Sequence, residues 1–341
     1  MFEFKNIENI DTDLLTAFVV NHEYGNIFQT SDYYYVHKNQ QGTTPFGFAV
    51  TENQQIAGIV IGVIYENYFP PVNLFTRRAV IMGGPLVLSG RNDILEFMLI
   101  NLISQLRKKC IYVQLRNLSD TAQFRQIFEK SGFIYEDHLD IIHNLNKPAE
   151  EIKLKISKNK RGNVNKSRNK GAFVREITDL SEFRKGLNLI RRTYKRVGLP
   201  LPDDNYFIHA HRQLSDNEIL KTFGAFYQDV MIGVRMELCY NGMIYDWYAG
   251  ADENYKSLYP NDLLPYSILM WGHEKGFYTF DFGGAGKPDL PYGVREHKMK
   301  FGGELVNYGR YELVNHKLVM SVAKSGFILY KKIKKYAGSQ N

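Results

Sequence analysis

The sequence predicts an α/β protein made of two copies of one mixed unit, and three observations support this prediction. The chain has 341 residues, more than a single hydrophobic core usually organises. Strand-like and helix-like patterns of apolar residues alternate along it. The same order of patterns returns after about 170–175 residues, roughly half the chain, as in an internal duplication. We therefore expect two similar domains, each a mixed twisted sheet flanked by helices.

The first half of the sequence predicts the following elements in chain order: a hairpin (residues 46–50 with 56–65), a strand (78–82), a long helix (94–109), a strand (111–115), a second helix (121–130) and two closing strands (133–135 and 140–145). The long helix rests on apolar residues at helical spacing, such as Leu95, Met98, Leu99 and Leu102. Glycine punctuates the pattern, because Gly83 and Gly84 follow one strand and Gly132 stops the second helix.

The second half repeats this order with a helix (residues 179–196), a hairpin (223–227 with 230–240), a strand (243–249), a long helix (263–275) and a strand (277–282). Residues 95–115 pair with residues 264–282, and residues 130–133 pair with residues 300–303. The predicted domains are residues 1–150 and 173–341, joined by a basic helical linker at residues 151–172.

The segment of residues 150–171 differs from its surroundings in charge, because it contains eight basic residues and almost no acid: Lys153, Lys155, Lys158, Lys160, Arg161, Lys166, Arg168 and Lys170. Two interpretations are equally supported. The segment is a solvated helical linker, as most charge runs are, or a helix that faces the phosphates of a polyanion.

The net charge, the cysteine content and the longest apolar run limit the functions that the chain can have. A net charge of +7 favours an anionic partner, such as a nucleic acid, a phosphorylated substrate or an acidic membrane surface. The two cysteines, Cys110 and Cys239, form no CxxC pair and indicate buried thiols rather than a disulfide framework or a metal site. The longest apolar run, residues 56–64, is too short to span a bilayer, and the N-terminus does not read as a signal peptide, so a soluble cytoplasmic protein is expected.

Residues 276–303 carry the strongest chemical signal. A half-buried strand ends at Asp281, and Gly283, Gly284 and Gly286 follow it, where the backbone can turn tightly or approach a ligand. A basic segment that includes Lys298 comes next. A carboxylate, a glycine turn and a lysine can hold an anion or a developing oxyanion, although a tight corner with solvated lysines has the same pattern. The paired segment in the first half lacks the glycine cluster and the lysines, which favours a catalytic role for the second copy.

The order of elements in each half resembles that of a GNAT acyltransferase domain, and two such domains in tandem resemble the FemABX family. The resemblance covers nearly the whole chain and rests on short pieces in the family's order: Phe28-Gln29-Thr30-Ser31, Gly84-Pro85, Ser131-Gly132-Phe133, Lys160-Arg161, Lys170-Gly171, Tyr248-Ala249-Gly250, Pro260 to Leu264, Phe280-Asp281-Phe282-Gly283-Gly284 and Lys298-Met299-Lys300-Phe301-Gly302-Gly303. It implies an aminoacyltransferase that needs no cofactor. The donor would be an aminoacyl-tRNA, and the acceptor a side-chain amine of a UDP-linked or lipid-linked muropeptide precursor of peptidoglycan.

The resemblance also implies roles for individual residues. Lys298 falls on the family lysine that stabilises the oxyanion, with His297 in place of the family's phenylalanine, and Asp281 would orient the amine or accept its proton. The candidate substrate-binding residues are Lys38, Arg196, Tyr206, Tyr248, Tyr292 and Arg295. Lys38 matches a phosphate-binding lysine, and Arg196 is the candidate replacement for a family arginine whose position is Pro202 here.

Departures from the family leave the substrate open. Gly83 and Leu88 stand where the family has an arginine and an acid that bind the muropeptide. The alternative is an acyl-CoA-dependent N-acyltransferase, but residues 254–262, before the second long helix, lack the glycine-rich phosphate loop that such enzymes carry. A third interpretation is a scaffold that only binds an anionic wall precursor or RNA. Lys331, Lys332, Lys334 and Lys335 are either a solvated tail or a peripheral contact with an anionic membrane.

Overall fold

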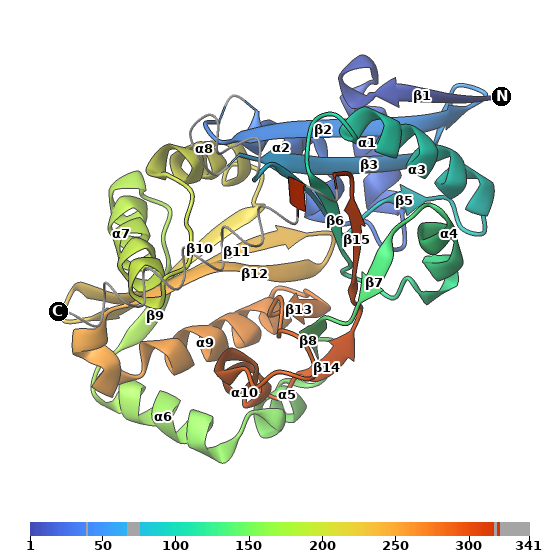
Figure 1. Cartoon of the computed structure of the whole chain (residues 1–341). Helices are drawn as coiled ribbons and strands as arrows, with labels where there is room; N and C mark the ends of the chain where they lie inside the picture. The colour runs from blue at the N-terminus through green and yellow to red at the C-terminus, as the bar shows by residue number, and fades with distance from the viewer. Residues whose placement is uncertain (39, 67–75, 317–318, 321–341) are drawn as a thin grey trace. The chain divides into compact units, whose positions relative to one another are not determined.

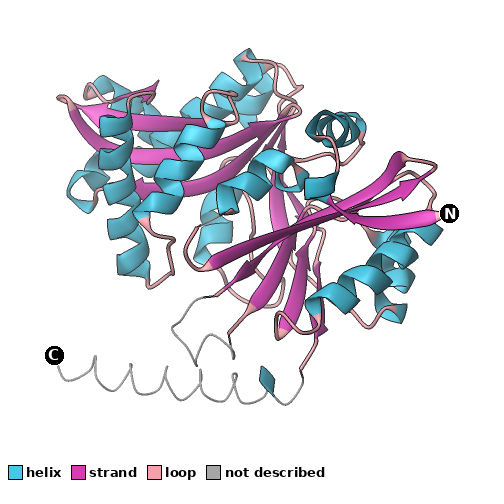
Figure 2. Ribbon diagram, turned by 90° about the horizontal axis from the view of Figure 1, so that it is seen from above, coloured by secondary structure: helices cyan, strands magenta, loops and turns pink. Residues whose placement is uncertain are grey.

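A computed structural model of the chain describes residues 1–38, 40–66, 76–316 and 319–320. The basic residues Lys331, Lys332, Lys334 and Lys335 lie outside this range. The chain forms two compact units. Unit 1 comprises Met1–Glu136 together with the segment that begins at Tyr308, and unit 2 is Asp137–Asn307. Each unit has one mixed sheet with helices packed on it (Figures 1 and 2), which confirms the predicted fold class.

Unit 1 contains these elements: β1 (Phe2–Asn6), η1 (Ile7–Asn9), α1 (Thr12–Asn21), η2 (Ile27–Gln29), α2 (Ser31–His37), β2 (Thr43–Glu52), β3 (Gln55–Tyr65), β4 (Arg78–Met82), β5 (Leu86–Val87), α3 (Asn92–Leu106), β6 (Tyr112–Arg116), η4 (Ala122–Phe124), α4 (Arg125–Lys130), β7 (Ile134–Glu136) and β15 (Arg310–Val314). Its strand order is β1-β2-β3-β4-β6-β15-β7, with β5 paired to β3. The pair β4 and β6 is parallel, and the other pairs are antiparallel.

Unit 2 contains these elements: β8 (Leu139–Asn144), α5 (Ala149–Lys155), α6 (Lys158–Asn169), β9 (Phe173–Glu176), α7 (Leu180–Val197), α8 (Asp204–Leu214), β10 (Leu220–Tyr227), β11 (Val230–Tyr240), β12 (Met243–Ala251), η5 (Glu253–Leu258), α9 (Pro260–Glu274), β13 (Thr279–Asp281), α10 (Gly293–Met299) and β14 (Glu304–Asn307). Its strand order is β14-β8-β13-β12-β11-β10-β9. Here the parallel pair is β12 and β13.

Apart from β5, which pairs with β3 in unit 1, the two sheets correspond strand for strand, and they exchange one strand. In unit 1, β15 lies between β6 and β7; in unit 2, β8 lies between β13 and β14. In Figure 1 the red β15 accordingly runs beside green strands, and the green β8 lies among orange and red ones. Each unit therefore takes its second-to-last strand from chain that adjoins the other unit in sequence. This is a non-local pairing that no sequence pattern marks.

The duplication predicted from the sequence is visible in matching turns. The helices α4 and α10 both end at a glycine in the left-handed region, Gly132 with φ of 92° and Gly302 with φ of 89°. Each of these glycines donates its N–H to the carbonyl three residues earlier, on Glu129 and Met299. At Gly302 a Cβ would lie 2.5 Å from the carbonyl oxygen of Lys155, so only glycine fits.

Each unit has its own hydrophobic core. The core of unit 1 includes the helical residues predicted for α3, of which Leu95, Met98, Leu99, Leu102 and Leu106 are all buried. The core of unit 2 is formed by the inner faces of α5, α6 and α9 against the sheet. Both cysteines are buried free thiols, as predicted.

Two of the family-like pieces in unit 1 have a structural explanation. The side chain of Gln29 is fully buried; its Nε2 donates to the carbonyls of Ile61 and Met82 at 2.9 and 2.7 Å, and its Oε1 accepts the N–H of Ile61 at 2.8 Å. A Cβ at Gly84 would lie 2.4 Å from Cδ of Gln29. The glutamine therefore replaces missing ladder bonds between β3 and β4, and Gly84 makes room for it.

The boundaries of the compact units differ from the predicted division into residues 1–150, 151–172 and 173–341. The predicted linker forms α5 and α6, and these helices belong to unit 2. Ile152, Val164 and Ser167 are buried against that unit, and Ser167 donates to the carbonyl oxygen of Leu258 at 2.6 Å. The charge run obscures this packing in the sequence. Most of its basic residues lie on the outer side of the helices, and the apolar and small residues that pack against unit 2 form a stripe on the inner side.

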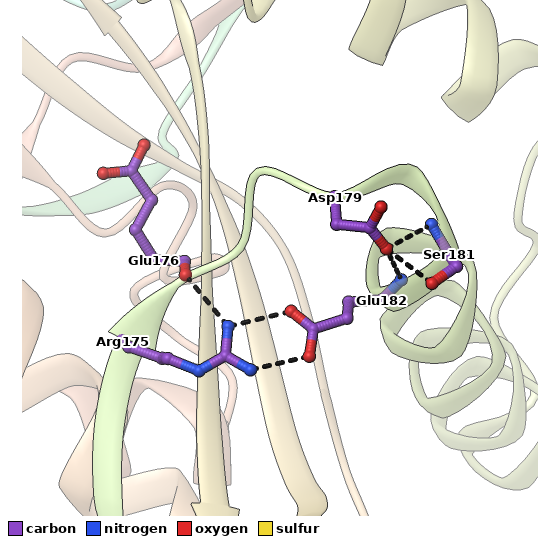
Figure 3. A network of polar contacts seen from close by, with 5 residues as sticks. All are labelled: Arg175, Glu176, Asp179, Ser181 and Glu182. Carbon is purple, nitrogen blue, oxygen red and sulfur yellow. Dashed lines mark hydrogen bonds and ion pairs between the residues drawn. The ribbon is translucent and has the colours of Figure 1, made fainter.

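The sequence patterns also failed to predict two helices of unit 2. Neither α8 nor α10 was predicted, because their apolar stripes are short and mixed with histidine and charge. The predicted helix at residues 179–196 is α7, whose start is fixed by polar contacts. Asp179 accepts the N–H groups of Ser181 and Glu182, and Arg175 of β9 pairs with Glu182 at 2.6 Å (Figure 3).

Candidate active site

Unit 2 has a cavity of about 310 Å³ at the carboxyl ends of its parallel strands β12 and β13. Its lining includes side chains from both strands' ends and from α9, α10 and β11, namely Ala249, Phe282, Asn261, His297, Lys298 and Arg235. The carboxyl end of a parallel pair, where two strands diverge and their loops begin, is where α/β sheets bind ligands. The loop that the sequence singled out, residues 276–303, forms one wall.

Lys298 lies in this wall, and its ammonium group is fully engaged. Its Nζ donates to the carbonyl oxygens of Phe282, Gly283 and Gly284 at 2.6, 3.1 and 3.2 Å. Burial lowers the pKa of Lys298, and the acidic groups Asp246 and Asp140 oppose that effect. The lysine both lines the cavity and holds the glycine turn closed.

Asp281 faces the other side of the turn. Its carboxylate accepts the N–H of Gly283 at 2.6 Å, and its side chain is buried beside Asp140 and does not line the cavity. Burial and then the charge of Asp140 raise the pKa of Asp281 well above its usual range, which favours the protonated form. A buried, protonated carboxyl that caps the turn is suited to positioning Lys298 rather than to accepting a proton from an amine.

A second cation, Arg235 of β11, lies in the lining and is held by a buried carboxylate. Its guanidinium pairs with Asp246 of β12 at 2.5 Å, and both side chains are almost completely buried. Glu237 faces Asp246 across the strand pair; burial and then the charge of Asp246 raise its pKa. The register of β11 and β12 shifts at this point and leaves Trp247 unpaired as a bulge. Bulges are frequent beside active sites because they redirect side chains.

A buried cation of α6 joins the two helices that flank the cavity. Lys160 pairs with Asp262 in the first turn of α9, and its Nζ lies 3.1 Å from Nδ1 of His297 on α10. Asn163 donates to the other oxygen of Asp262 at 2.7 Å. Burial, followed by the charge of Lys160, lowers the pKa of His297 to about 4, so the neutral imidazole accepts from the ammonium. His297 thus has a structural partner that the phenylalanine of the family could not have.

The two predicted tyrosines, Tyr206 and Tyr248, lie in one aromatic cluster of unit 2. Their rings both contact Phe207 and Trp247, with centroid distances of 4.8–5.9 Å. Tyr194 of α7 joins the cluster through Tyr248 at 5.7 Å. Neither predicted tyrosine lines the 310 Å³ cavity. The structure brings these two residues together, next to β12.

The remaining predicted residues have identifiable partners of their own. Arg295 donates to the carbonyls of Ala285, Lys287 and Leu290 and so holds the loop before α10. Tyr292 begins α10, is exposed and packs near Gly286. Arg196 pairs with Glu253 on the exposed side of α7. Lys38 belongs to unit 1, where it pairs with Glu8 at 2.6 Å.

Sequence reasoning missed Arg235, Asp246 and the bridge from Lys160 to Asp262. A signal for the first two was present, because charged residues in otherwise apolar strands, as in residues 230–240, cannot be buried without partners. The bridge has no local signal, since Lys160 looks like any other residue of its charge run. In the part of the chain that the structure describes, no cluster of His, Cys, Asp and Glu could hold a metal ion, and no helix has the length and apolarity needed to cross a membrane.

Comparison with known proteins defines the class of this fold. Residues 155–298 match the acetyltransferase (GNAT) domain family, and this match covers the whole cavity lining. No curated protein sequence matches the chain. The unit 2 sheet, with its parallel pair β12 and β13, is therefore GNAT-like, and unit 1 repeats its topology. This domain match supports the expectation of an acyltransferase.

Solved structures extend the likeness to the whole chain. A crystal structure of FemX is similar with a TM-score of 0.74 at 15% identity, covering 94% of this chain and 100% of that one. The C-terminal domain of a putative lysylphosphatidylglycerol synthetase from Agrobacterium fabrum has a TM-score of 0.59 at 11% identity, covering 92% and 94%. A tandem GNAT protein of the clavulanic acid biosynthesis pathway has a TM-score of 0.55 at 11% identity, covering 92% and 99%. The resemblance to FemABX proteins is thus confirmed at the level of the fold.

Proposed function

We propose that the chain is an aminoacyltransferase of the FemABX type, which moves an amino acid from aminoacyl-tRNA to a side-chain amine of a peptidoglycan precursor peptide. The observation that carries this proposal is the position of Lys298, at the carboxyl ends of β12 and β13, in the wall of the unit 2 cavity. It is the lysine that the sequence resemblance assigned to the oxyanion. The FemX-like fold of the whole chain supports the same reaction.

The chemistry required is an attack of an amine on an ester carbonyl. The new C–N bond forms, the carbonyl oxygen becomes an oxyanion, and the ester C–O bond then breaks. The proton lost by the amine ends on the ribose hydroxyl that leaves. A fixed donor directed at the oxyanion lowers the barrier, and loss of one such donor typically costs roughly 100- to 1000-fold in rate. Lys298 provides this donor when the longest of its three bonds, to Gly284, is exchanged for the substrate oxygen.

The surroundings favour tRNA over a CoA thioester as donor. In an acyl-CoA enzyme the pyrophosphate would bind at the N-terminus of α9, which would need free N–H groups and glycines. Here the first turn of α9 carries the carboxylate of Asp262, and the preceding η5 begins with Asp252 and Glu253. Asp262 and Glu253 are paired with Lys160 and Arg196, so ion pairs occupy this end of α9 in place of the glycines that would admit a pyrophosphate. On the outer side of α6, in contrast, Lys158, Lys166, Arg168 and Lys170 are exposed to a polyanion.

The test is transfer by the purified protein from charged tRNAs to amine-bearing muropeptides. Lys298→Ala should lower the transfer rate at least roughly 100-fold. Lys300→Ala is the matched control, because it removes an exposed lysine two residues away. Equal rates in the two variants would refute the role of Lys298. Charge reversal at Lys166 should raise KM for aminoacyl-tRNA and reduce the salt dependence of kcat/KM.

The second candidate function is an acyl-CoA-dependent N-acyltransferase acting on another amine. It is favoured by the match of residues 155–298 to the acetyltransferase domain. Acetyl-CoA would then raise the melting temperature and support turnover, and charged tRNA would do neither. If both donors bind without turnover, a binding scaffold replaces both proposals.

A further inference from the structure

Unit 1 has a groove of about 870 Å³ at the position that the active-site cavity occupies in unit 2. It lies at the carboxyl ends of the parallel strands β4 and β6, where residues 83–88 and 117–124 meet α1, α3 and α4. Its volume is that of a typical small-molecule site. The transfer step proposed above is placed in unit 2 and assigns no ligand to this groove.

Aligning the two units residue by residue shows that unit 1 has apolar residues at the positions of the charged residues of the active site. Gly132 matches Gly302, which places Phe128 at the position of Lys298. Tyr65 and Tyr240 end the equivalent strands β3 and β11, which places Val60 at the position of Arg235. By the register of the next strands, Ile81 replaces Asp246. Phe128, Val60 and Ile81 are all buried.

The charged groups that line the groove are acidic. Glu23 follows α1, and Asp120 precedes η4, where it accepts the N–H of Ala122 at 2.8 Å. Both carboxylates act on the phenol of Tyr24. Its pKa is raised first by burial, then by a hydrogen bond and the charge of Glu23, and then by the charge of Asp120. Among the described residues of the lining there is no lysine or arginine.

Both ring nitrogens of His22, the single histidine of the lining, are engaged in hydrogen bonds. Its Nδ1 accepts the N–H of Tyr24 at 3.1 Å, so the proton is on Nε2, which donates to the carbonyl oxygen of Val87 at 2.8 Å. The groove therefore has no group that would neutralise a phosphate or a carboxylate.

The remaining lining is largely apolar. Leu86, Val87, Leu95 and Phe128 are buried and form the floor. At the rim, Leu14 and Leu88 remain 57% and 42% exposed, although they face a concave surface. A contiguous apolar patch in a concave surface with polar residues around it is typical of a ligand-binding groove.

We propose that this groove is a second binding site, which takes a ligand with an aliphatic chain and an ammonium group. The chain lies over Leu14, Leu86 and Leu88, and the ammonium lies between Glu23 and Asp120. All residues of this site belong to unit 1, whereas Lys298 and the cavity of the proposed transfer step belong to unit 2.

The test compares ligands of equal length and different charge on the full-length protein. By calorimetry and thermal shift, octylammonium should bind and raise the melting temperature, octanol should bind more weakly, and octanoate should not bind. Glu23 and Asp120 are exposed, so each carboxylate–ammonium pair contributes less than about 1 kcal/mol, and the two together separate octylammonium from octanol by roughly tenfold in Kd. Butylammonium should bind weakly because it covers little apolar surface.

Variants locate the site. Glu23→Gln with Asp120→Asn keeps the hydrogen bonds and removes the charges, so octylammonium should bind roughly tenfold more weakly and octanol equally well. Ala17→Trp places a large side chain in the groove from an exposed position of α1 and should abolish both. Asp13→Asn, on the same helix but outside the lining, should change nothing. Equal binding of octanoate and octylammonium, or unchanged binding to Ala17→Trp, would overturn the proposal.

Discussion

The Nζ atom of Lys298 lies 2.6 Å from the carbonyl oxygen of Phe282 and donates also to Gly283 and Gly284. An ammonium group has three protons, so these three carbonyls use its whole capacity. The lysine is therefore a structural clamp of the glycine turn in the absence of substrate. It becomes an electrophilic donor only when a substrate oxygen displaces one of the carbonyls.

This clamp predicts a loss of stability as well as of activity. Lys298→Met removes the donor from three carbonyls in a partly buried turn, which should lower the free energy of unfolding by about 1–3 kcal/mol. Urea denaturation followed by circular dichroism measures the change. Lys300→Met, at an exposed position, should leave the midpoint within error. If both variants unfold at the same urea concentration, the clamp does not contribute to stability.

A second prediction concerns the buried pair of Lys160 and Asp262, which holds α9 and α10 on either side of the cavity. Lys160→Met leaves an uncompensated carboxylate and should cost about 3–5 kcal/mol. Lys160→Met with Asp262→Leu removes both charges and should recover much of that loss. The double variant should still have a raised KM for the donor, because α9 and α10 beside the cavity lose the bridge through Lys160.

A double-mutant cycle measures this coupling from thermal or urea unfolding. Lys158→Met, on the exposed side of the same helix, is the control and should be close to neutral. Additive effects of the Lys160 and Asp262 substitutions would show that the pair is not coupled.

Stability against pH gives a third prediction, centred on His143 of β8. Burial, and then the charge of Lys155, lowers the pKa of His143 from 6.5 to about 4. Between these two pH values the unfolded state binds more protons than the folded state. Unit 2 should therefore be most stable above pH 6.5 and lose about 3 kcal/mol as the pH falls towards 4. His297, whose pKa is lowered too, contributes with the same sign in unit 2, and His37, with a lowered pKa, does so in unit 1.

His143→Leu isolates this contribution. The ring packs against Phe282 at 5.3 Å and its Nε2 has no hydrogen-bond partner among the described residues, so an aliphatic replacement loses little at pH 8. Melting temperatures between pH 4.5 and 6.5 should then fall less steeply than in the wild type. An unchanged slope would mean that His143 titrates normally in the folded state.

Much of this fold was predictable because its elements follow local patterns. The hairpin of β2 and β3, the strand β4 and the helix α3 recur in the same order as β10 with β11, β12 and α9, and burial follows their apolar periodicity. The exchange of β8 and β15 was not predictable, because a strand's pattern specifies its buried face and not its neighbour in the sheet. For the same reason the boundaries of the units were misplaced.

The candidate site was predictable only in part. Lys298 and the glycine turn were found because glycines, a carboxylate and a lysine are close together in sequence. Asp281 was found as well, but its burial beside Asp140 gives it a positioning rather than a proton-accepting geometry. Arg235 comes from a strand more than 60 residues earlier in the chain, and only the sheet brings it to the same cavity.

The last prediction concerns Gly250, the third residue of the Tyr248-Ala249-Gly250 piece. A Cβ at this position would lie 2.5 Å from the backbone nitrogen of Ile190, so α7 packs with its backbone directly on β12. Gly250→Ala must displace α7, and with it Tyr194 of the aromatic cluster, at a cost of about 1–3 kcal/mol. Gly162→Ala is the matched control, because Gly162 lies inside α6 with open space around its Cβ position. That change should stabilise by about 0.5–1 kcal/mol. Urea unfolding of the two variants should therefore shift in opposite directions, and a Gly250→Ala protein as stable as the wild type would show that α7 and β12 are not in backbone contact.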